Sequence, residues 1–367
     1  MKLTGFTLYR YSLPLVAPLR LKDRELHHRE GLLLELVAED GVTGLGEASP
    51  LPRFSPETTG QAARQLVSLA LFLLERNLAE DGATLSDALV RELESLDAAP
   101  SVRFGIELAL WNLQAESEGK SLPEALCSLR VASVPVNGVL DGTVEEVLVE
   151  GRRMREAGYE AVKLKVGGCG VEEVSLVRNL AEVLGDGTAL RLDANRAWSF
   201  AEAAAFARAV ADVRYEYIEE PLADPSGLAD LVRETGVPVA LDESLVGMAP
   251  EDLVEHDYAR AVVIKPTLVG GISRTLRLAK EARGLGITPV ISSAYETGVG
   301  TEALLALSAA TGSGEISAGL DTYRRLGADV VHPTLNVASP RVDLREESTA
   351  SRSLCQRYLK VYSSSEG

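Results

Sequence analysis

Acidic and basic side chains recur at regular steps through the second half of the chain. Each follows a short apolar run, and the steps between them are 28, 26, 23, 23 and 27 residues. One strand, one helix and two short connections take about that length, so these side chains are expected at the same end of successive parallel strands. The series consists of Lys165, Asp193, Glu219, Asp242, Lys265 and Ser292.

The three carboxylates of this series predict a metal site. Asp193, Glu219 and Asp242 end three consecutive predicted strands, which places their oxygen atoms within reach of one point. A set of oxygen ligands without histidine or cysteine suits a hard divalent cation. We therefore expect Mg²⁺, with Mn²⁺ as the second choice, and with coordination positions left for water or substrate.

Lysines flank the expected metal site. Lys163 and Lys165 lie two residues apart in AVKLKV and so point to the same face of a strand, while Lys265 approaches from the opposite side. Lysines around a metal held by acids suit removal of a proton beside a carboxylate, because the metal stabilises the enolate that forms. The usual lysine pKa of about 10.4 must fall for this task. Nearby cations lower it, and Lys163 and Arg191 are the candidates. We assign Lys165 as the base, since it lies nearer the strand end.

The elements that must position these side chains alternate between strand and helix. Eight short apolar runs lie between residues 133 and 320, and the segments between them have apolar residues at three- and four-residue intervals. An open doubly wound sheet shows the same alternation, but convergence of polar side chains from several strand ends favours a parallel (β/α) barrel. The opening third shows strand alternation followed by helical patterns, which predicts an α+β domain.

Composition and charge narrow the class of protein. The net charge of −17 and the pI near 4.8 oppose binding to nucleic acid or to anionic lipid. No apolar run approaches the roughly 20 residues of a membrane span, and the N-terminus lacks a signal-peptide core. Cys127, Cys169 and Cys355 have neither disulfide nor zinc spacing. We expect a cytoplasmic protein acting on a small-molecule carboxylate, with its oligomeric state left open.

With these residues placed, the chain resembles the enolase superfamily, in particular its muconate-lactonising subgroup. Five motifs carry the resemblance in one order at barrel spacing: KLK at 163–165, DAN at 193–195, EEP at 219–221, DES at 242–244 and IKP at 264–266. Further stretches are most similar to the o-succinylbenzoate synthase family, namely SVRFGIELALWNL, RLDANRAW, ISSAYETGVG and GLDTYRRLGADVV.

The resemblance implies a modified TIM barrel, (β/α)7β, over residues 101–321. An α+β capping domain of residues 1–100, completed by the C-terminal tail from about 322 to 367, is implied as well. The implied reaction is Mg²⁺-dependent syn-dehydration of 2-succinyl-6-hydroxy-2,4-cyclohexadiene-1-carboxylate to 2-succinylbenzoate in menaquinone biosynthesis. Lys165 would remove the proton α to the ring carboxylate and then protonate the departing hydroxyl, while Lys265 would stabilise the enolate. Residues 19–31 would form a lid over the barrel mouth.

Other activities on the same framework stay open. N-succinylamino acid racemisation needs lysines on both faces, which Lys165 and Lys265 supply, and muconate lactonisation uses the same framework. Dipeptide epimerases typically show Asp-x-Asp after the eighth strand, where this chain has Asp321, Thr322 and Tyr323, so the missing second acid counts against that activity. Outside the superfamily, the alternatives are a barrel that forms a Schiff base through lysine and a barrel without catalysis.

The remaining expectations concern supporting and substrate-binding residues. Asn195 is expected to support the metal site through hydrogen bonds, and Glu243, beside a proposed ligand but of opposite parity, to lie behind it. Arg191 has a second interpretation as a buried cation paired with a carboxylate. Groups near the sixth and seventh strand ends are candidates for holding the succinyl carboxylate. They are Gly270, Gly271, Ser292 and Ser293.

Overall fold

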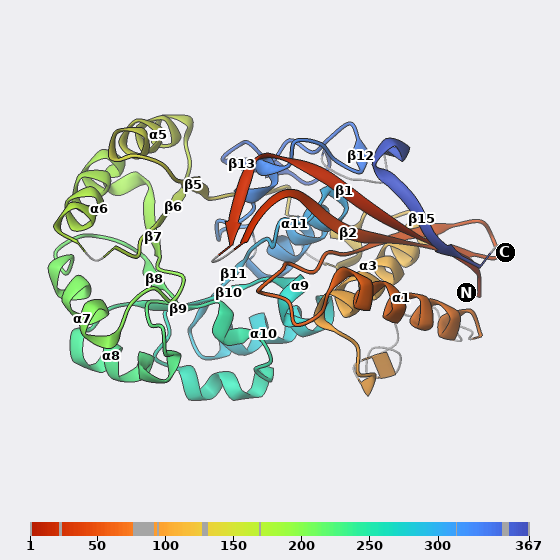
Figure 1. Cartoon of the computed structure of the whole chain (residues 1–367), viewed down its shortest axis with the longest axis horizontal. Coiled ribbons are helices and arrows are strands. Elements are labelled where there is room, and N and C mark those ends of the chain that lie inside the picture. Colours follow the sequence, from red (N-terminus) through yellow and green to blue (C-terminus); the bar gives the residue numbers. More distant parts are fainter. Residues whose placement is uncertain are drawn as a thin grey trace.

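The protein contains a parallel barrel and an antiparallel capping sheet, which lie side by side in space (Figure 1). The computed structural model describes residues 2–21, 24–75, 92–93, 95–126, 131–168, 170–312, 314–346 and 352–365. Cys127 and Cys169 lie outside the described residues, and Cys355 is a free thiol. Within the described ranges, no helix is both long enough and apolar enough to cross a bilayer.

The barrel is built on a seven-stranded parallel sheet whose strands follow sequence order. The strands are β5 (Gly138–Leu140), β6 (Ala161–Lys165), β7 (Ala189–Asp193), β8 (Tyr217–Glu219), β9 (Val239–Leu241), β10 (Ala261–Ile264) and β11 (Thr288–Ile291). The expected eighth strand contributes only two bridges, Ala318 to Val136 and Gly319 to Ser292, and these join the two edges of the sheet. Glycine permits this close approach, because a Cβ at Gly319 would lie 2.5 Å from Ser292 Oγ and 3.1 Å from Ser292 Cβ. The predicted (β/α)7β barrel is confirmed.

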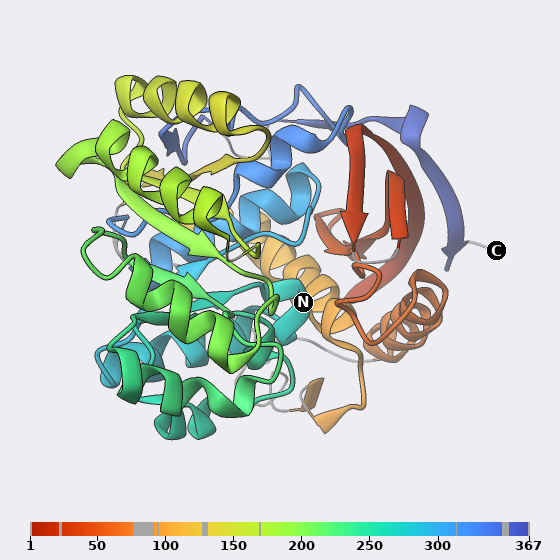
Figure 2. The same cartoon turned by 60° about the vertical axis from the view of Figure 1, so that its left-hand side comes forward.

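Helices cover the outside of the barrel, as Figure 2 shows for the run from α5 to α8. Their starts and ends follow local sequence signals. Helix α5, for example, begins with a capping box between Thr143 and Glu146 and ends at Gly158 in the left-handed conformation. The outer helices are α5 (Val144–Ala157), α6 (Val171–Leu184), α7 (Phe200–Ala209), α8 (Leu228–Thr235), α10 (Ile272–Gly284) and α11 (Gly298–Gly312), with the short α9 (Pro266–Val269) after β10.

Among the described residues, the capping domain packs a four-stranded antiparallel sheet against two helices. The strand order is β15 (Leu359–Ser364), β1 (Leu3–Leu21), β2 (Arg24–Ala38) and β3 (Thr43–Ala48), so the C-terminal tail lies beside the N-terminal strands (Figure 1). The helices are α1 (Thr59–Leu74) and α3 (Pro100–Ser117). Helix α3 lies so close to β3 that a Cβ at Gly46 would stand 1.9 Å from the carbonyl oxygen of Gly105. The apolar core of the cap therefore continues to Leu113, beyond the expected boundary at residue 100.

Short elements connect the two domains. Helix α4 (Leu122–Leu126) leads from α3 toward the barrel, and of two small antiparallel pairs the first joins the C-terminal segment to the start of the barrel while the second lies within that segment. These pairs are β4 (Ser133–Pro135) with β13 (Arg341–Asp343) and β12 (Val331–His332) with β14 (Ser353–Leu354). The β1–β2 hairpin extends from the capping sheet toward the barrel (Figure 1). The segment expected as a lid, residues 19–31, forms part of this hairpin, and residues 22–23 lie outside the described ranges.

Candidate active site

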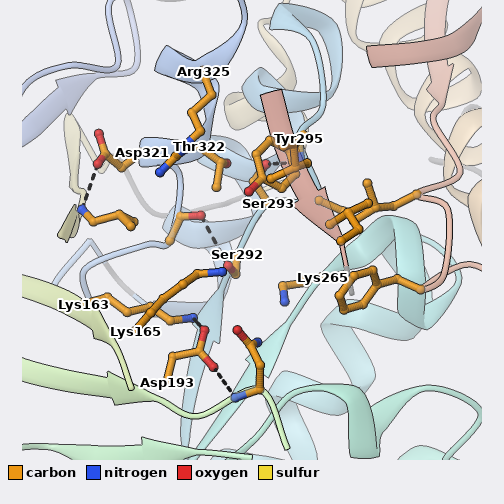
Figure 3. Close-up of a pocket in the computed structure, with 18 of the residues that line it drawn as sticks. Lys163, Lys165, Asp193, Lys265, Ser292, Ser293, Tyr295, Asp321, Thr322 and Arg325 are labelled. Carbon is orange, nitrogen blue, oxygen red and sulfur yellow. Dashed lines mark hydrogen bonds and ion pairs between the residues drawn. The ribbon is translucent and has the colours of Figure 1, made fainter. Parts of the chain in front are cut away.

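A cavity of about 700 Å³ lies at the C-terminal ends of the barrel strands and is closed on one side by the capping domain. The barrel supplies most of the site residues predicted from sequence: Lys163, Lys165, Asp193, Asn195, Glu243, Lys265, Ser292 and Ser293. The cap supplies an apolar wall from the hairpin and from the segment after β3: Ala17, Pro18, Leu19, Leu21, Leu51 and Phe54. Figure 3 shows Lys163 and Lys165 entering from one side and Lys265 from the other.

Strand register places the predicted catalytic residues in layers. Lys165 pairs with Asp193 across β6 and β7, and Asp193 pairs with Glu219 across β7 and β8, so these three side chains share one layer. Lys163 pairs with Arg191 one layer deeper, as the alternation of side chains requires. The Lys165 side chain is exposed to the cavity, whereas Lys163 is largely buried.

The ammonium group of Lys163 lies between two carboxylates. Its Nζ is 2.8 Å from Asp193 Oδ2 and 2.9 Å from Glu219 Oε2. Burial opposes the charge of Lys163, but Asp193 and Glu219 outweigh it and hold the pKa of Lys163 well above its usual value. Burial also acts to raise the pKa of Asp193, and the charge of Lys163 reverses this and lowers it. Lys163 belongs to the layer below Asp193 and Glu219, and its long side chain brings the ammonium group up to their carboxylates.

Lys265 forms the corresponding ion pair on the other side, with Asp242 Oδ2. Burial opposes its charge, and the Asp242 carboxylate overcomes this and raises the pKa of Lys265. Burial raises the pKa of Asp242 as well. Burial, with the charge of the neighbouring Asp193 as the second cause, raises the pKa of Glu219 to about 8. Three buried carboxylates thus share a small volume with two ammonium groups.

The residue types fit a hard divalent cation, although the side chains do not close around one point. In the part of the chain that the structure describes, no three carboxylate, imidazole or thiolate groups converge as a metal site, and ammonium groups stand among the acids instead. Buried carboxylates need a counter-charge, and three oxygen donors from adjacent strand ends are a set that Mg²⁺ prefers. The ligand set Asp193, Glu219 and Asp242 therefore suits Mg²⁺ by chemistry and position, and stays a prediction.

Neighbouring polar groups orient the acids. The backbone N–H of Asn195 donates to Asp193 Oδ1 at 3.1 Å, so the expected support from Asn195 comes through its main chain. Glu220, fully buried, accepts hydrogen bonds from the backbone N–H groups of Asp242 and Ser244 at 2.9 and 2.7 Å. It thereby holds the turn that presents Asp242. Glu243 lines the cavity, and burial raises its pKa.

The structure corrects the expectation for two glycines and agrees with the second interpretation of Arg191. Gly270 and Gly271 do not line the cavity; they pack against the N-terminal half of α3, where a Cβ at Gly271 would stand 2.8 Å from Glu107 Oε1. Helix α9 inserts between the strand end and these glycines, which carries them away from the mouth. Arg191 is a buried cation paired with a carboxylate, as its second interpretation states. Its guanidinium binds Glu216, Asn137 and the carbonyl of Ser317 below the acids.

The two serines face the cavity but direct their hydroxyl groups elsewhere. Ser292 Oγ donates to the carbonyl of Gly319 at 3.3 Å, and Ser293 Oγ donates to Glu296 Oε2 at 2.7 Å. Their backbone N–H groups donate to the carbonyls of Ile264 and Gly319. A carboxylate needs hydrogen-bond donors, and these four donors are already engaged. The expected role of Ser292 and Ser293 in holding a succinyl carboxylate stays a prediction that would require these bonds to rearrange.

Sequence reasoning missed a second polar end of the cavity. Arg324, Arg325 and Tyr295 line it beside Asp321 and Thr322, as Figure 3 shows for the labelled members of this group. Arg325 pairs with Asp141 at 3.1 Å, and Arg324 with Asp321 at 2.9 Å. The sequence signal for this polar end is the pair of arginines that directly follows Asp321, Thr322 and Tyr323.

Comparison with known proteins shows the family of this chain. Family models described as "Enolase C-terminal domain-like" and "MenC, N-terminal domain" match residues 146–348 and 3–113. Over 351 residues the chain is 34% identical to an o-succinylbenzoate synthase of Pasteurella multocida (strain Pm70), and the match covers 93% of this chain and 96% of that protein.

Solved structures match over nearly the whole chain. The N-succinyl Arg/Lys racemase from Bacillus cereus ATCC 14579 has a TM-score of 0.84 at 21% identity, covering 99% of both chains. The dipeptide epimerase from Enterococcus faecalis V583, complexed with Mg and the dipeptide L-Leu-L-Tyr, has a TM-score of 0.83 at 22% identity, covering 96% of this chain and 100% of that one. At these identities the likeness concerns the fold alone.

Proposed function

Because the chain belongs to the enolase superfamily and is related over nearly its whole length to o-succinylbenzoate synthases, we propose that it is itself an o-succinylbenzoate synthase. The reaction is dehydration of 2-succinyl-6-hydroxy-2,4-cyclohexadiene-1-carboxylate to 2-succinylbenzoate in menaquinone biosynthesis. The observation that carries the proposal is the placement of lysines on both sides of three buried carboxylates, with the lysines and Asp193 lining one cavity. The dehydratase activity, the Mg²⁺ requirement and a cytoplasmic location are parts of this proposal.

Each residue has a task that follows from its position. Asp193, Glu219 and Asp242 would hold Mg²⁺, which when bound supplies positive charge for the enolate. Lys165, in its neutral form, takes the proton α to the ring carboxylate. The resulting ammonium group then gives a proton to the departing hydroxyl, which is possible because proton and hydroxyl leave from the same face of the ring. Lys265 adds positive charge from the opposite side, where the flat ring forms.

The walls of the cavity fit a substrate with an apolar ring and a second carboxylate. Leucines and Phe54 from the cap offer apolar surface to the ring and to the methylene groups. At the other end, Arg325 supplies a guanidinium whose side chain is one-third exposed and pairs with a more exposed acid, Asp141. Such a pair is worth little in water, so an incoming carboxylate can take the place of Asp141.

A second activity, N-succinylamino acid racemisation, is favoured by one specific observation. Lys165 and Lys265 enter the cavity from opposite sides (Figure 3), as proton transfer on both faces of one carbon requires. Dipeptide epimerisation has less support, because the only acid of the expected pair, Asp321, is already engaged. Its Oδ2 accepts from the backbone N–H of Val139 at 2.8 Å and pairs with Arg324 at 2.9 Å.

The direct test is turnover of freshly generated 2-succinyl-6-hydroxy-2,4-cyclohexadiene-1-carboxylate, followed by loss of the diene absorbance with Mg²⁺ and with EDTA. We expect fast turnover that EDTA abolishes. N-succinylamino acids are assayed in D₂O in parallel, where α-proton exchange reports racemisation. Turnover that survives EDTA, together with trapping of substrate by borohydride, would instead indicate a Schiff-base enzyme. Absence of both turnover and exchange in a protein that binds Mg²⁺ would reject both activities.

A further inference from the structure

Arg29 is a fully buried cation that lies between the two domains. It is 1% exposed and stands on β2, in the capping sheet. All five of its N–H donors are used, and every acceptor is a backbone carbonyl oxygen. Nε donates to Tyr295, Nη1 to Glu30 and Pro50, and Nη2 to Ser49 and Ala294. A planar guanidinium is the side chain whose donors can reach several carbonyl groups at once.

Four of the five acceptors belong to two segments that form the cavity wall, and the fifth, Glu30, follows Arg29 on β2. Ser49 and Pro50 directly precede Leu51, and the carbonyl of Leu51 accepts from the backbone N–H of Phe54 at 3.0 Å. Ala294 and Tyr295 lie in the connection between β11 and α11. Leu51, Phe54, Ala294 and Tyr295 all line the cavity. One side chain of the cap therefore binds the main chain of both segments.

These segments meet in a single apolar cluster over the cavity. The cluster joins Leu51 and Phe54 to Ala294 and Tyr295, and it also takes in Leu268 of α9 with Leu19 and Leu21 of the hairpin. Its members come from four separate stretches of the chain, so their relative positions depend on what holds the stretches together. Arg29 joins two of these four stretches through hydrogen bonds, three of which measure 2.9 to 3.2 Å.

The barrel segment needs such a restraint. Tyr295 has a φ of +66°, in the left-handed region that an aromatic residue rarely adopts. Its carbonyl is held by Arg29 Nε, and the following residue, Glu296, accepts hydrogen bonds from Ser293 and Ala294 within the same turn. From the cap, Glu47 binds the backbone N–H groups of Thr297 and Gly300 just beyond it. The capping domain thus holds this turn at two points.

We propose that Arg29 is a positioning residue for substrate binding: it couples the capping domain to the barrel by setting the positions of segments 49–54 and 294–295. It touches neither the lysines nor the acids through any of its five hydrogen bonds. Its effect therefore falls on the wall that receives the apolar part of the substrate. For the identity of that substrate, this inference rests on the proposed dehydratase function.

The test uses Arg29→Lys and Arg29→Gln in the full chain, with Arg10→Gln as the matched control. Arg10 lies on the neighbouring strand and is exposed, in an ion pair with Glu30 at 3.0 Å. Lysine has three donors and so leaves at least two carbonyl groups without a partner. Because hydrogen bonds to a charged donor are the ones lost, we expect KM to rise about ten-fold or more in both Arg29 variants. The turnover number and the Mg²⁺ dissociation constant should change less than about three-fold, since the reacting groups are untouched.

A double-mutant cycle and hydrogen exchange complete the test. Phe54→Ala alone should raise KM, and combining it with Arg29→Lys should raise KM by much less than the product of the two effects, because both act through one wall. Backbone amides of 49–55 and 293–297 should exchange faster in Arg29→Lys, while those of β6 to β9 keep their protection.

The outcomes are decisive. An equal loss of turnover number and Mg²⁺ affinity, multiplicative effects in the cycle, or unchanged exchange in both segments would overturn the positioning role. Failure of both variants to fold would assign Arg29 to stability alone and would also overturn it. If the wild-type protein lacks dehydratase turnover, the proposed function fails, and hydrogen exchange still decides whether Arg29 positions the two segments.

Discussion

Replacement of Lys165 by alanine should abolish turnover while leaving the stability of the folded protein nearly unchanged. The side chain is exposed to the cavity, unlike Lys163 and Lys265, which are largely buried in ion pairs with the acids. Truncation therefore creates no buried void and leaves no buried charge without a partner. Changes of this kind usually stay within about 0.5 kcal/mol of stability. For a chain of this size we expect the melting temperature to shift by about 2 °C or less.

The expected loss of rate is much larger. General acid or base catalysis by a positioned side chain contributes about 10²–10⁴-fold, and Lys165 is proposed to act first as the base and then as the acid. We expect kcat to fall at least about 10⁴-fold, which corresponds to about 5 kcal/mol of activation free energy at 1.36 kcal/mol for each factor of ten. The Mg²⁺ dissociation constant should stay close to that of the wild type, because Lys165 is not a proposed ligand.

The assay is turnover of the cyclohexadiene substrate, together with melting temperature and Mg²⁺ titration on the same preparations. Lys165→Arg is the matched variant that keeps the positive charge but cannot lose its proton at neutral pH. It should be as inactive as Lys165→Ala. Lys360→Ala, which removes an exposed lysine from β15, is the control and should be fully active. Substantial turnover in Lys165→Ala, or in Lys165→Arg, would refute the assignment of the base.

Three further predictions concern the opposite lysine, the metal and the cap. Lys265→Ala should lower kcat at least about 10³-fold in a folded protein, because charge aimed at the enolate is lost; near-normal kcat would contradict its role. Asp242→Asn should weaken Mg²⁺ binding about ten-fold or more, and calorimetric titration showing unchanged affinity would remove Asp242 from the ligand set. Gly46→Ala should destabilise the protein by about 1–3 kcal/mol or more, since its Cβ would stand 1.9 Å from the Gly105 carbonyl oxygen. Chemical denaturation measures this, and Gly187→Ala, where a Cβ meets nothing within 4 Å, should be neutral.

The sequence was sufficient for the barrel and for the layer of proposed reactive groups, because both depend on short-range periodicity. Alternation along β6 decides that Lys163 and Lys165 share a face, and the repeat of the βα unit decides that Asp193 and Glu219 reach the same level. These are local rules with periods of two residues and of one structural unit. They also predicted the cavity position of Lys265, the last lysine of the series.

The tertiary structure alone decided which groups are kept away from the site and which distant groups complete it. Gly270 and Gly271 follow a strand end in sequence, yet the one-turn helix α9 directs them toward α3. Arg29 and Tyr295 are 266 residues apart and carry no shared motif, yet they are hydrogen-bonded across the two domains. Contacts of this kind form only when separate elements pack, because no local period relates their positions. The wall that shapes the cavity is therefore a property of the packed domains, whereas the reactive residues follow from the repeat along the chain.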